Sequence, residues 1–176
     1  MANLARNDAE AEQLKLREWI FEPGLPSNVA RPDPAAFAEV DSAVRAYASS
    51  SAIPAAYNGW TSAERMRFLD NIPKDRSAAQ LAELDRQLGL STTQNNEILF
   101  LWLELALANR YDPAVPQAEQ FLARVGRAKF VRPLFQVLWN EGDWGRPIAK
   151  RIYAKTRPSY HAVTRGAVDR VLGVTG

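Results

Sequence analysis

The chain has 176 residues, 47% of them hydrophobic and 24% charged, which suits one well-buried domain and is short for a two-domain enzyme. It has no cysteine and a single histidine, His161, which excludes disulfides, cysteine nucleophiles and the common zinc ligand sets. The net charge of +2 is uneven: residues 1–123 hold 11 basic and 17 acidic residues (−6), whereas residues 124–176 hold 11 and 3 (+8).

Neither a membrane span nor a secretion signal is expected. The longest apolar run, over residues 98–103, falls well short of the ~20 residues of a span and is flanked by Glu97 and Glu104. Acidic residues precede any apolar run at the start of the chain, unlike a signal peptide. Together with the lack of cysteine, this predicts a soluble, cytoplasmic protein with no membrane partner.

The first third of the chain predicts a short helix, an extended stretch and a longer helix. Residues 8–18 are compatible with the short helix, and the prolines and glycine within residues 19–34 predict little regular structure there. Asp33 followed by Pro34 predicts the start of a helix over residues 34–50, whose apolar residues recur with helical spacing.

Capping boxes predict the next two helices. Thr61 with Glu64 opens the first, which should end near Pro73 because the residue before a proline disfavours helical geometry. Ser77 with Gln80 opens the second, and Gly89 should end it.

Residues 97–109 are apolar around most of the helical circumference, which predicts a central helix that others cover. A strand over residues 98–103 is the alternative, but the run continues into helix-forming residues. Gly126 should stop a further helix over residues 115–125. The remaining predicted helices cover residues 130–139, 147–155 and 161–172.

The predicted fold is all-α. About eight helices at spacings of roughly 16 to 20 residues, joined by short turns, predict antiparallel neighbours along the chain. One helical hairpin every ~30 to 40 residues is typical of solenoids of the ARM or HEAT kind. We therefore expect a two-layered α-α superhelix.

Four strings resemble the C-terminal helical domain of leukotriene A4 hydrolase and its aminopeptidase relatives, the gluzincin metallopeptidases. They are WIFEPGLP at 19–26, NNEI at 95–98, GRAKFVRPLF at 126–135 and HAVT at 161–164. The resemblance implies that a catalytic domain carrying an H-E-x-x-H zinc motif precedes this one. It predicts a lead-in helix and proline-rich linker from that missing domain over residues 1–33, and the helical C-terminal domain over 34–176.

The resemblance also implies that Arg127 and Lys129 bind the C-terminal carboxylate of a peptide substrate. The chemistry of Arg127 and Lys129 is consistent with this role. Two cations beside a helix N-terminus favour an anion, and arginine supplies a planar fork matched to a carboxylate. The alternative is that both are solvated cations on a basic face. Arg132 would either join this anion site or pair with a carboxylate at the edge of the core.

No residue is expected to be catalytic or to bind a metal, and no cofactor motif is present. His161, with Ser159 as a plausible N-cap, is interpreted as a structural residue of a first helical turn. Four of the five tryptophans are interpreted as core or interdomain packing; they are Trp60, Trp102, Trp139 and Trp144. Any zinc would belong to the catalytic domain of the parent protein.

The favoured function is that of a non-catalytic domain of a zinc-dependent aminopeptidase, which forms one wall of the peptide cleft and binds the substrate carboxylate. Its partners would be the catalytic domain and short peptides, and an exposed apolar patch is expected where that domain docks. A free-standing α-solenoid scaffold for protein interactions is the alternative. Nucleic-acid binding by the basic final third is disfavoured, because no motif for it is present.

Overall fold

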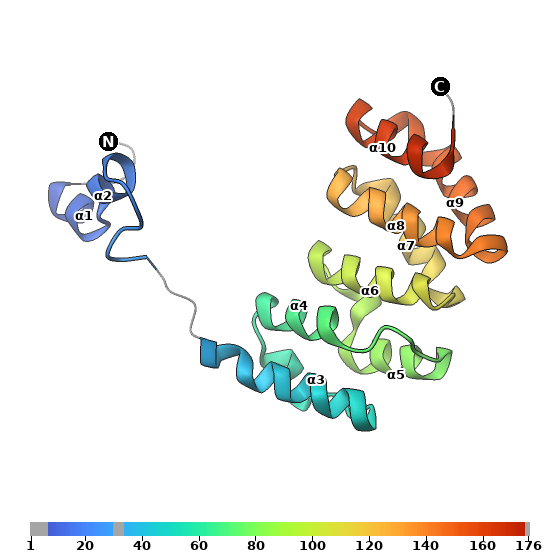
Figure 1. Ribbon diagram of the computed structural model, residues 1–176, viewed down its shortest axis with the longest axis horizontal. Coiled ribbons are helices and arrows are strands. Elements are labelled where there is room, and N and C mark those ends of the chain that lie inside the picture. The colour runs from blue at the N-terminus through green and yellow to red at the C-terminus, as the bar shows by residue number, and fades with distance from the viewer. Residues whose placement is uncertain (1–6, 30–33, 175–176) are drawn as a thin grey trace. The chain divides into compact units, whose positions relative to one another are not determined.

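The computed structural model describes residues 7–29 and 34–174. Over these residues the chain forms ten α-helices and five short 3-10 helices and contains no strand, which confirms the all-α prediction. The chain divides into two compact units, Met1–Phe37 and Ala38–Gly176, and Figure 1 traces both.

The first unit contains α1 (Asp8–Gln13) and α2 (Leu16–Phe21). The turn after α2 folds back on it, because Glu18 Oε2 accepts from Ser27 N at 2.9 Å and Trp19 Nε1 donates to Asn28 Oδ1 at 3.1 Å. The prediction of little regular structure from residue 19 onward was therefore wrong for the last three residues of α2. The first proline comes only at Pro23, so its restriction on the backbone begins after the helix has ended.

The second unit consists of eight α-helices, in agreement with the expected number. The predicted N-cap at Asp33 lies outside the described residues, and the 3-10 turn η1 (Pro34–Phe37) leads into the first of these helices. They are α3 (Ala38–Ser50), α4 (Ser62–Asn71), α5 (Ala78–Leu88), α6 (Asn96–Ala108), α7 (Val115–Arg124), α8 (Ala128–Asn140), α9 (Gly142–Thr156) and α10 (Ala162–Leu172). Four further 3-10 turns connect them, η2 (Ala55–Gly59), η3 (Leu90–Thr92), η4 (Asp112–Ala114) and η5 (Arg157–Ser159).

Both predicted capping boxes are confirmed. Thr61 N donates to Glu64 Oε2 at 2.7 Å while Glu64 N donates back to Thr61 Oγ1 at 3.3 Å, which starts α4. Ser77 and Gln80 make the same reciprocal pair at α5, with distances of 3.0 and 3.3 Å. Gly89 ends α5 in the left-handed conformation, at φ +62°, where glycine carries no steric penalty.

Two helices begin earlier than predicted, and each contains a proline. α8 starts at Ala128 and contains Pro133, and α9 starts at Gly142 rather than at Pro147. A proline inside a helix removes one backbone hydrogen bond, but packing of the rest of the helix can outweigh that cost. α8 packs against α6, α9 and α10, and α9 packs against α7 as well, so their prolines are retained within helices.

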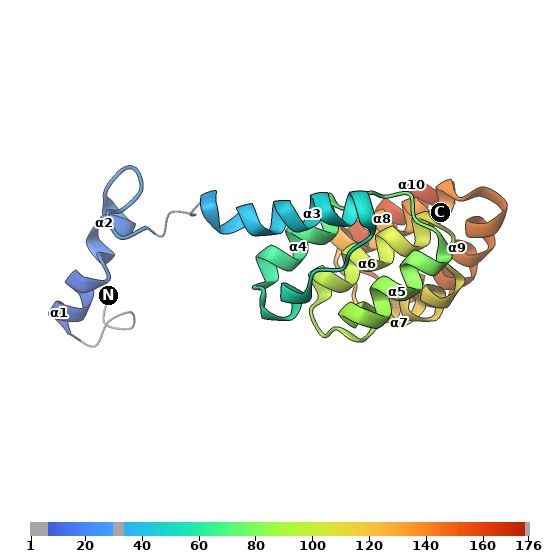
Figure 2. The same cartoon turned by 90° about the horizontal axis from the view of Figure 1, so that it is seen from below.

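The even-numbered helices of the second unit form one layer, and α5, α7 and α9 form the other, as Figures 1 and 2 show. This confirms the two-layered superhelix. In the first layer α4, α6, α8 and α10 run parallel, because each contact between neighbours joins residues at their N-terminal ends. Asn95 Nδ2 donates to Ser62 Oγ at 3.1 Å, the rings of Phe100 and Phe130 lie 5.4 Å apart, and Thr164 Oγ1 donates to Gly126 O at 3.0 Å.

The predicted central helix is α6. Its side chains at Leu99, Trp102 and Leu103 are fully buried, and Trp102 Nε1 donates to Ser91 Oγ at 2.9 Å. Trp60 also belongs to the core, whereas the other two tryptophans of the second unit pack against it half-buried, so the packing interpretation of these four residues is confirmed. Within the described residues, no helix has both the length and the apolar character needed to cross a bilayer.

Candidate anion-binding site at the start of helix α8

Among the described residues, no side chain caps the N-terminus of α8. Arg127 occupies the N-cap position with an extended backbone, at φ −77° and ψ 123°, and its own side chain makes no capping hydrogen bond. The first backbone N–H groups of a helix have no partner within the helix. Together with the helix dipole, they make this N-terminus favourable for an anion.

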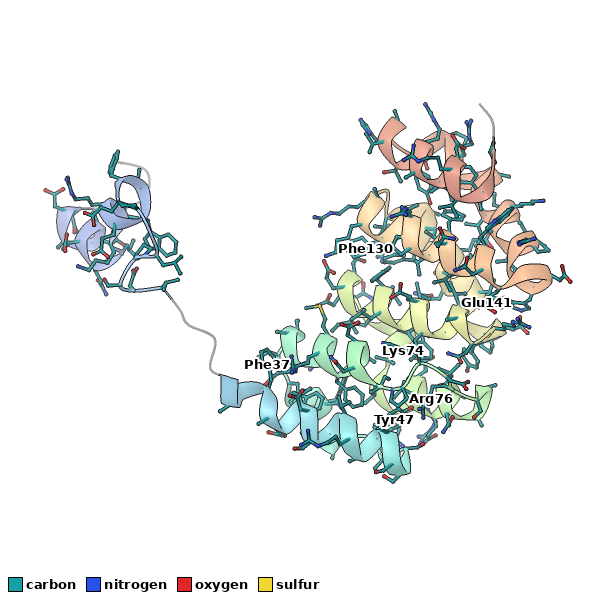
Figure 3. The ribbon with its side chains drawn as sticks, in the orientation of Figure 1. Phe37, Tyr47, Lys74, Arg76, Phe130 and Glu141 are labelled. Carbon is teal, nitrogen blue, oxygen red and sulfur yellow. The ribbon has the colours of Figure 1, made fainter. Side chains whose placement is uncertain are left out.

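A buried aromatic ring supports the two predicted site residues. Phe130 is 4% exposed, and its ring lies 6.0 Å from the Arg127 guanidinium carbon and 5.1 Å from Lys129 Nζ. The ring itself packs against Phe121 at 5.9 Å and against Phe100 on α6. Figure 3 labels Phe130 at the end of α8 where the helix begins. The structure therefore brings Arg127 and Lys129 together on a fixed base.

The two cations differ in their partners. Lys129 Nζ donates to Glu97 Oε1 at 2.6 Å across the gap between α8 and α6, and the Lys129 and Glu97 side chains are 48% and 37% exposed. Arg127 is exposed and, within the described part of the chain, forms no ion pair. One of the two expected carboxylate ligands is thus already bound to a carboxylate of the chain, and the other is available.

Glu97 was not among the predicted site residues, although it lies in the NNEI string. The available signal was its place in the first turn of a predicted helix, where acidic side chains are common. No local pattern connects it to Lys129, because the two residues are 32 positions apart.

Arg132 lies on α8 one turn after Lys129. It is exposed, and no carboxylate partner for it is found among the residues that the structure describes. Of the two alternatives for Arg132, pairing with a carboxylate at the core edge is therefore not observed.

His161 has a structural role, as predicted, but the predicted cap was wrong. His161 is itself the N-cap of α10, where its Nδ1 accepts from Val163 N at 3.3 Å. Ser159 lies within η5, and its hydroxyl donates instead to the Thr156 carbonyl at the end of α9, at 2.8 Å. The described residues form no cluster of three or more groups that could hold a metal, so they do not fit a zinc ion.

A small, mostly apolar groove of about 260 Å³ lies between α4 and α6. Glu97 lines it together with Met66, Arg67, Asp70, Phe100 and Leu101. Arg67 is held by a bidentate pair with Asp41, at 2.7 and 2.9 Å, and these hydrogen bonds lower the pKa of the Asp41 carboxyl. Glu97 therefore belongs both to the groove and to the ion pair at the start of α8.

Much of the positive charge of the final third is engaged by neighbouring groups. Arg157 pairs with Asp169 at 3.0 Å, and Glu119 pairs with both Arg151 and Lys155. Two further cations lie over the ring of Trp139; they are Arg146 and Lys150. With the Lys129–Glu97 pair, four of the eleven basic residues of 124–176 are in ion pairs within the described residues.

Comparison with known proteins identifies a matching family and several relatives of the chain. Residues 60–172 match the family model described as leukotriene A4 hydrolase, C-terminal. Leucine aminopeptidase 2 of Pyricularia oryzae is 32% identical over 121 residues, which cover 67% of this chain and 19% of that protein. Leucine aminopeptidase 2 of Ajellomyces capsulatus is 28% identical over 180 aligned residues, covering 94% of this chain and 28% of that protein.

A solved structure shares the fold of this chain. Native yeast leukotriene A4 hydrolase superimposes with a TM-score of 0.62 at 22% identity, covering 92% of this chain and 30% of that one. The chain thus spans no more than 30% of the length of any of these three relatives. On the evidence of the family match over most of its length, this chain belongs to the family of leukotriene A4 hydrolase C-terminal domains.

Proposed function

We propose that this chain forms one wall of the peptide cleft of a zinc-dependent aminopeptidase and binds the C-terminal carboxylate of the substrate. The observation that carries the proposal is the pair of exposed cations, Arg127 and Lys129, at the uncapped N-terminus of α8. Family membership favours this function over the scaffold and nucleic-acid alternatives. The described residues contain no cluster of groups that could hold a metal, and we assign the zinc and the catalytic groups to the catalytic domain.

Arg127 is the stronger of the two proposed ligands. It has no competing carboxylate in the described residues, and its guanidinium can donate two parallel hydrogen bonds to a carboxylate. Lys129 contributes a single point charge and must first leave Glu97. We therefore assign the main binding contribution to Arg127.

The first unit carries exposed apolar side chains that another region of the polypeptide could cover. Exposed large apolar side chains are concentrated there, with Leu25 79% exposed and Phe21 66% exposed. The others are Leu14, Trp19 and Ile20. Side chains of this kind at high exposure are typical of docking surfaces. We propose that residues 1–33 connect the helical domain, residues 34–176, to the catalytic domain and contact it, in a cytoplasmic enzyme.

The proposal is tested in the full aminopeptidase that contains this domain. Arg127→Ala should lower kcat/KM for a tripeptide with a free C-terminus by roughly 10- to 150-fold, because a hydrogen bond to a charged group is worth about 1.5 to 3 kcal/mol. Lys129→Ala should lower it less. The amidated tripeptide, which has no terminal carboxylate, should be cleaved almost as before by both variants.

Arg170→Ala is the matched control, because Arg170 is an exposed arginine in the last turn of α10 and its removal changes the net charge equally. It should leave kcat/KM for both peptides unchanged. Equal losses on the acid and the amide in Arg127→Ala would indicate damaged folding or docking, and no loss on either would refute carboxylate binding by Arg127.

A further inference from the structure

Lys129 already holds a carboxylate. Its Nζ lies 2.6 Å from Glu97 Oε1, and Glu97 offers the same chemical group as the terminus of a peptide. Among the described residues, this is the one ion pair that engages either cation of the proposed anion site. An incoming carboxylate therefore meets Lys129 in a paired state and Arg127 in an unpaired one.

The backbone of Glu97 is held in place, whereas its carboxylate can rotate. It lies in the first turn of α6, where Asn95 Oδ1 accepts from Glu97 N at 3.0 Å and the helix dipole favours a negative side chain. The Glu97 side chain is 37% exposed, so it can rotate toward solvent without entering the core. Ion pairs with this exposure contribute little to stability, so a ligand can displace one.

We propose that Glu97 is a resident competitor for Lys129 and thereby limits how tightly the site binds a carboxylate. In the free chain Glu97 occupies Lys129, and an incoming peptide terminus first binds Arg127. Lys129 then exchanges Glu97 for the peptide, so each binding event has to break the Glu97–Lys129 ion pair. This inference rests on the proposed carboxylate site and names the residue that sets its affinity.

The direct test measures binding of trialanine to the full 176-residue chain, monitored by NMR of the backbone amides of residues 126–132. Trialanine is used both as the free acid and as the C-terminal amide. Glu97→Gln keeps the shape of the side chain and removes its charge. It should lower the Kd for the acid about three- to fivefold, the range expected when an exposed ion pair no longer has to be broken. The Kd for the amide should not change.

Two further variants separate competition from a general change in charge. Glu119→Gln removes a glutamate that likewise pairs with a lysine, Lys155 at 2.5 Å, but between α7 and α9 in the other layer, and it should leave binding of the acid unchanged. In a Lys129→Met background the gain from Glu97→Gln should fall below twofold, because nothing remains for Glu97 to occupy. A gain that persists in that background would overturn competition in favour of simple repulsion.

The outcomes distinguish this inference from the function on which it rests. If the wild-type chain prefers the acid over the amide and Glu97→Gln leaves that preference unchanged or weaker, the inference fails and the proposed function stands. If the wild-type chain and Glu97→Gln both bind the acid no better than the amide, the proposed carboxylate site fails, and the inference fails with it.

Discussion

The rings of Phe100 and Phe130 lie 5.4 Å apart with their planes tilted by 56°, and they join α6 to α8 at the end where both helices begin. The same contact lies beneath the ion pair of Glu97 and Lys129, which also connects these two helices. The candidate anion site is therefore supported by the aromatic core of the helical layer. Its geometry should depend on that core.

The first prediction concerns this support. Phe130→Ala should lower the free energy of unfolding by about 3 to 5 kcal/mol, the usual cost of truncating a buried phenylalanine. Urea denaturation followed by circular dichroism measures the change. Val163→Ala, at a side chain 68% exposed, is the control and should cost little. A loss below about 1 kcal/mol in Phe130→Ala would contradict the described packing, since even small core truncations reach that size.

The second prediction concerns the close approach of α8 and α9. A Cβ atom at Gly145 would lie 1.9 Å from the Leu138 carbonyl oxygen, so Gly145→Ala must displace backbone and should destabilise the chain by about 3 kcal/mol or more. At Gly166 in α10 the nearest atom to a new Cβ is the end of the Arg170 side chain, at 3.8 Å. Gly166→Ala should stabilise by roughly 0.5 to 1 kcal/mol. Thermal unfolding of both variants compares the two opposite signs directly.

The third prediction concerns buried tyrosine hydroxyls. Tyr47 is 1% exposed and its hydroxyl has no hydrogen-bond partner among the described residues, whereas Tyr160 Oη donates to the Leu122 carbonyl at 2.8 Å. Tyr47→Phe should leave the free energy of unfolding unchanged or raise it by up to about 1 kcal/mol, because it removes an unsatisfied polar group. Tyr160→Phe should lower it by about 1 to 2 kcal/mol, because it leaves a buried carbonyl unpaired. Destabilisation of Tyr47→Phe equal to that of Tyr160→Phe would show that the Tyr47 hydroxyl has a partner in solution.

Local signals account for what the sequence predicted correctly. The capping boxes at Thr61 and Ser77 and the stop at Gly89 depend on residues within one helical turn, so their patterns were sufficient. The start of α9 was misplaced because long-range packing outweighs the local cost of Pro147, whereas α8 begins only two residues before the predicted start and Pro133 lay inside the predicted helix.

In the candidate site, too, local sequence patterns identified some residues and missed another. Arg127 and Lys129 could be identified because they share one short string that resembles a family. Glu97 could not be identified as their neighbour, because its contact with Lys129 exists only once α6 and α8 lie side by side. Nothing in the local sequence records that arrangement.

The last prediction concerns pH and the junction between α9 and α10. Asp169 accepts from Arg157 at 3.0 and 3.1 Å and from Tyr153 Oη at 2.7 Å, and these bonds, that from Arg157 foremost, hold the pKa of the Asp169 carboxyl below its usual range. A carboxyl whose pKa is lower in the folded than in the unfolded chain stabilises the fold above its unfolded pKa of about 3.9 and loses that contribution as pH falls through the folded pKa.

The free energy of unfolding should therefore decline from pH 5 toward pH 2, by less in Asp169→Asn than in the wild type. Asp143→Asn, an exposed first-turn residue of α9, is the control and should retain the wild-type slope. Urea titrations at a series of pH values measure both slopes. If the Asp169→Asn curve runs parallel to the wild-type curve over this range, Asp169 is not held in its charged form by Arg157 and Tyr153.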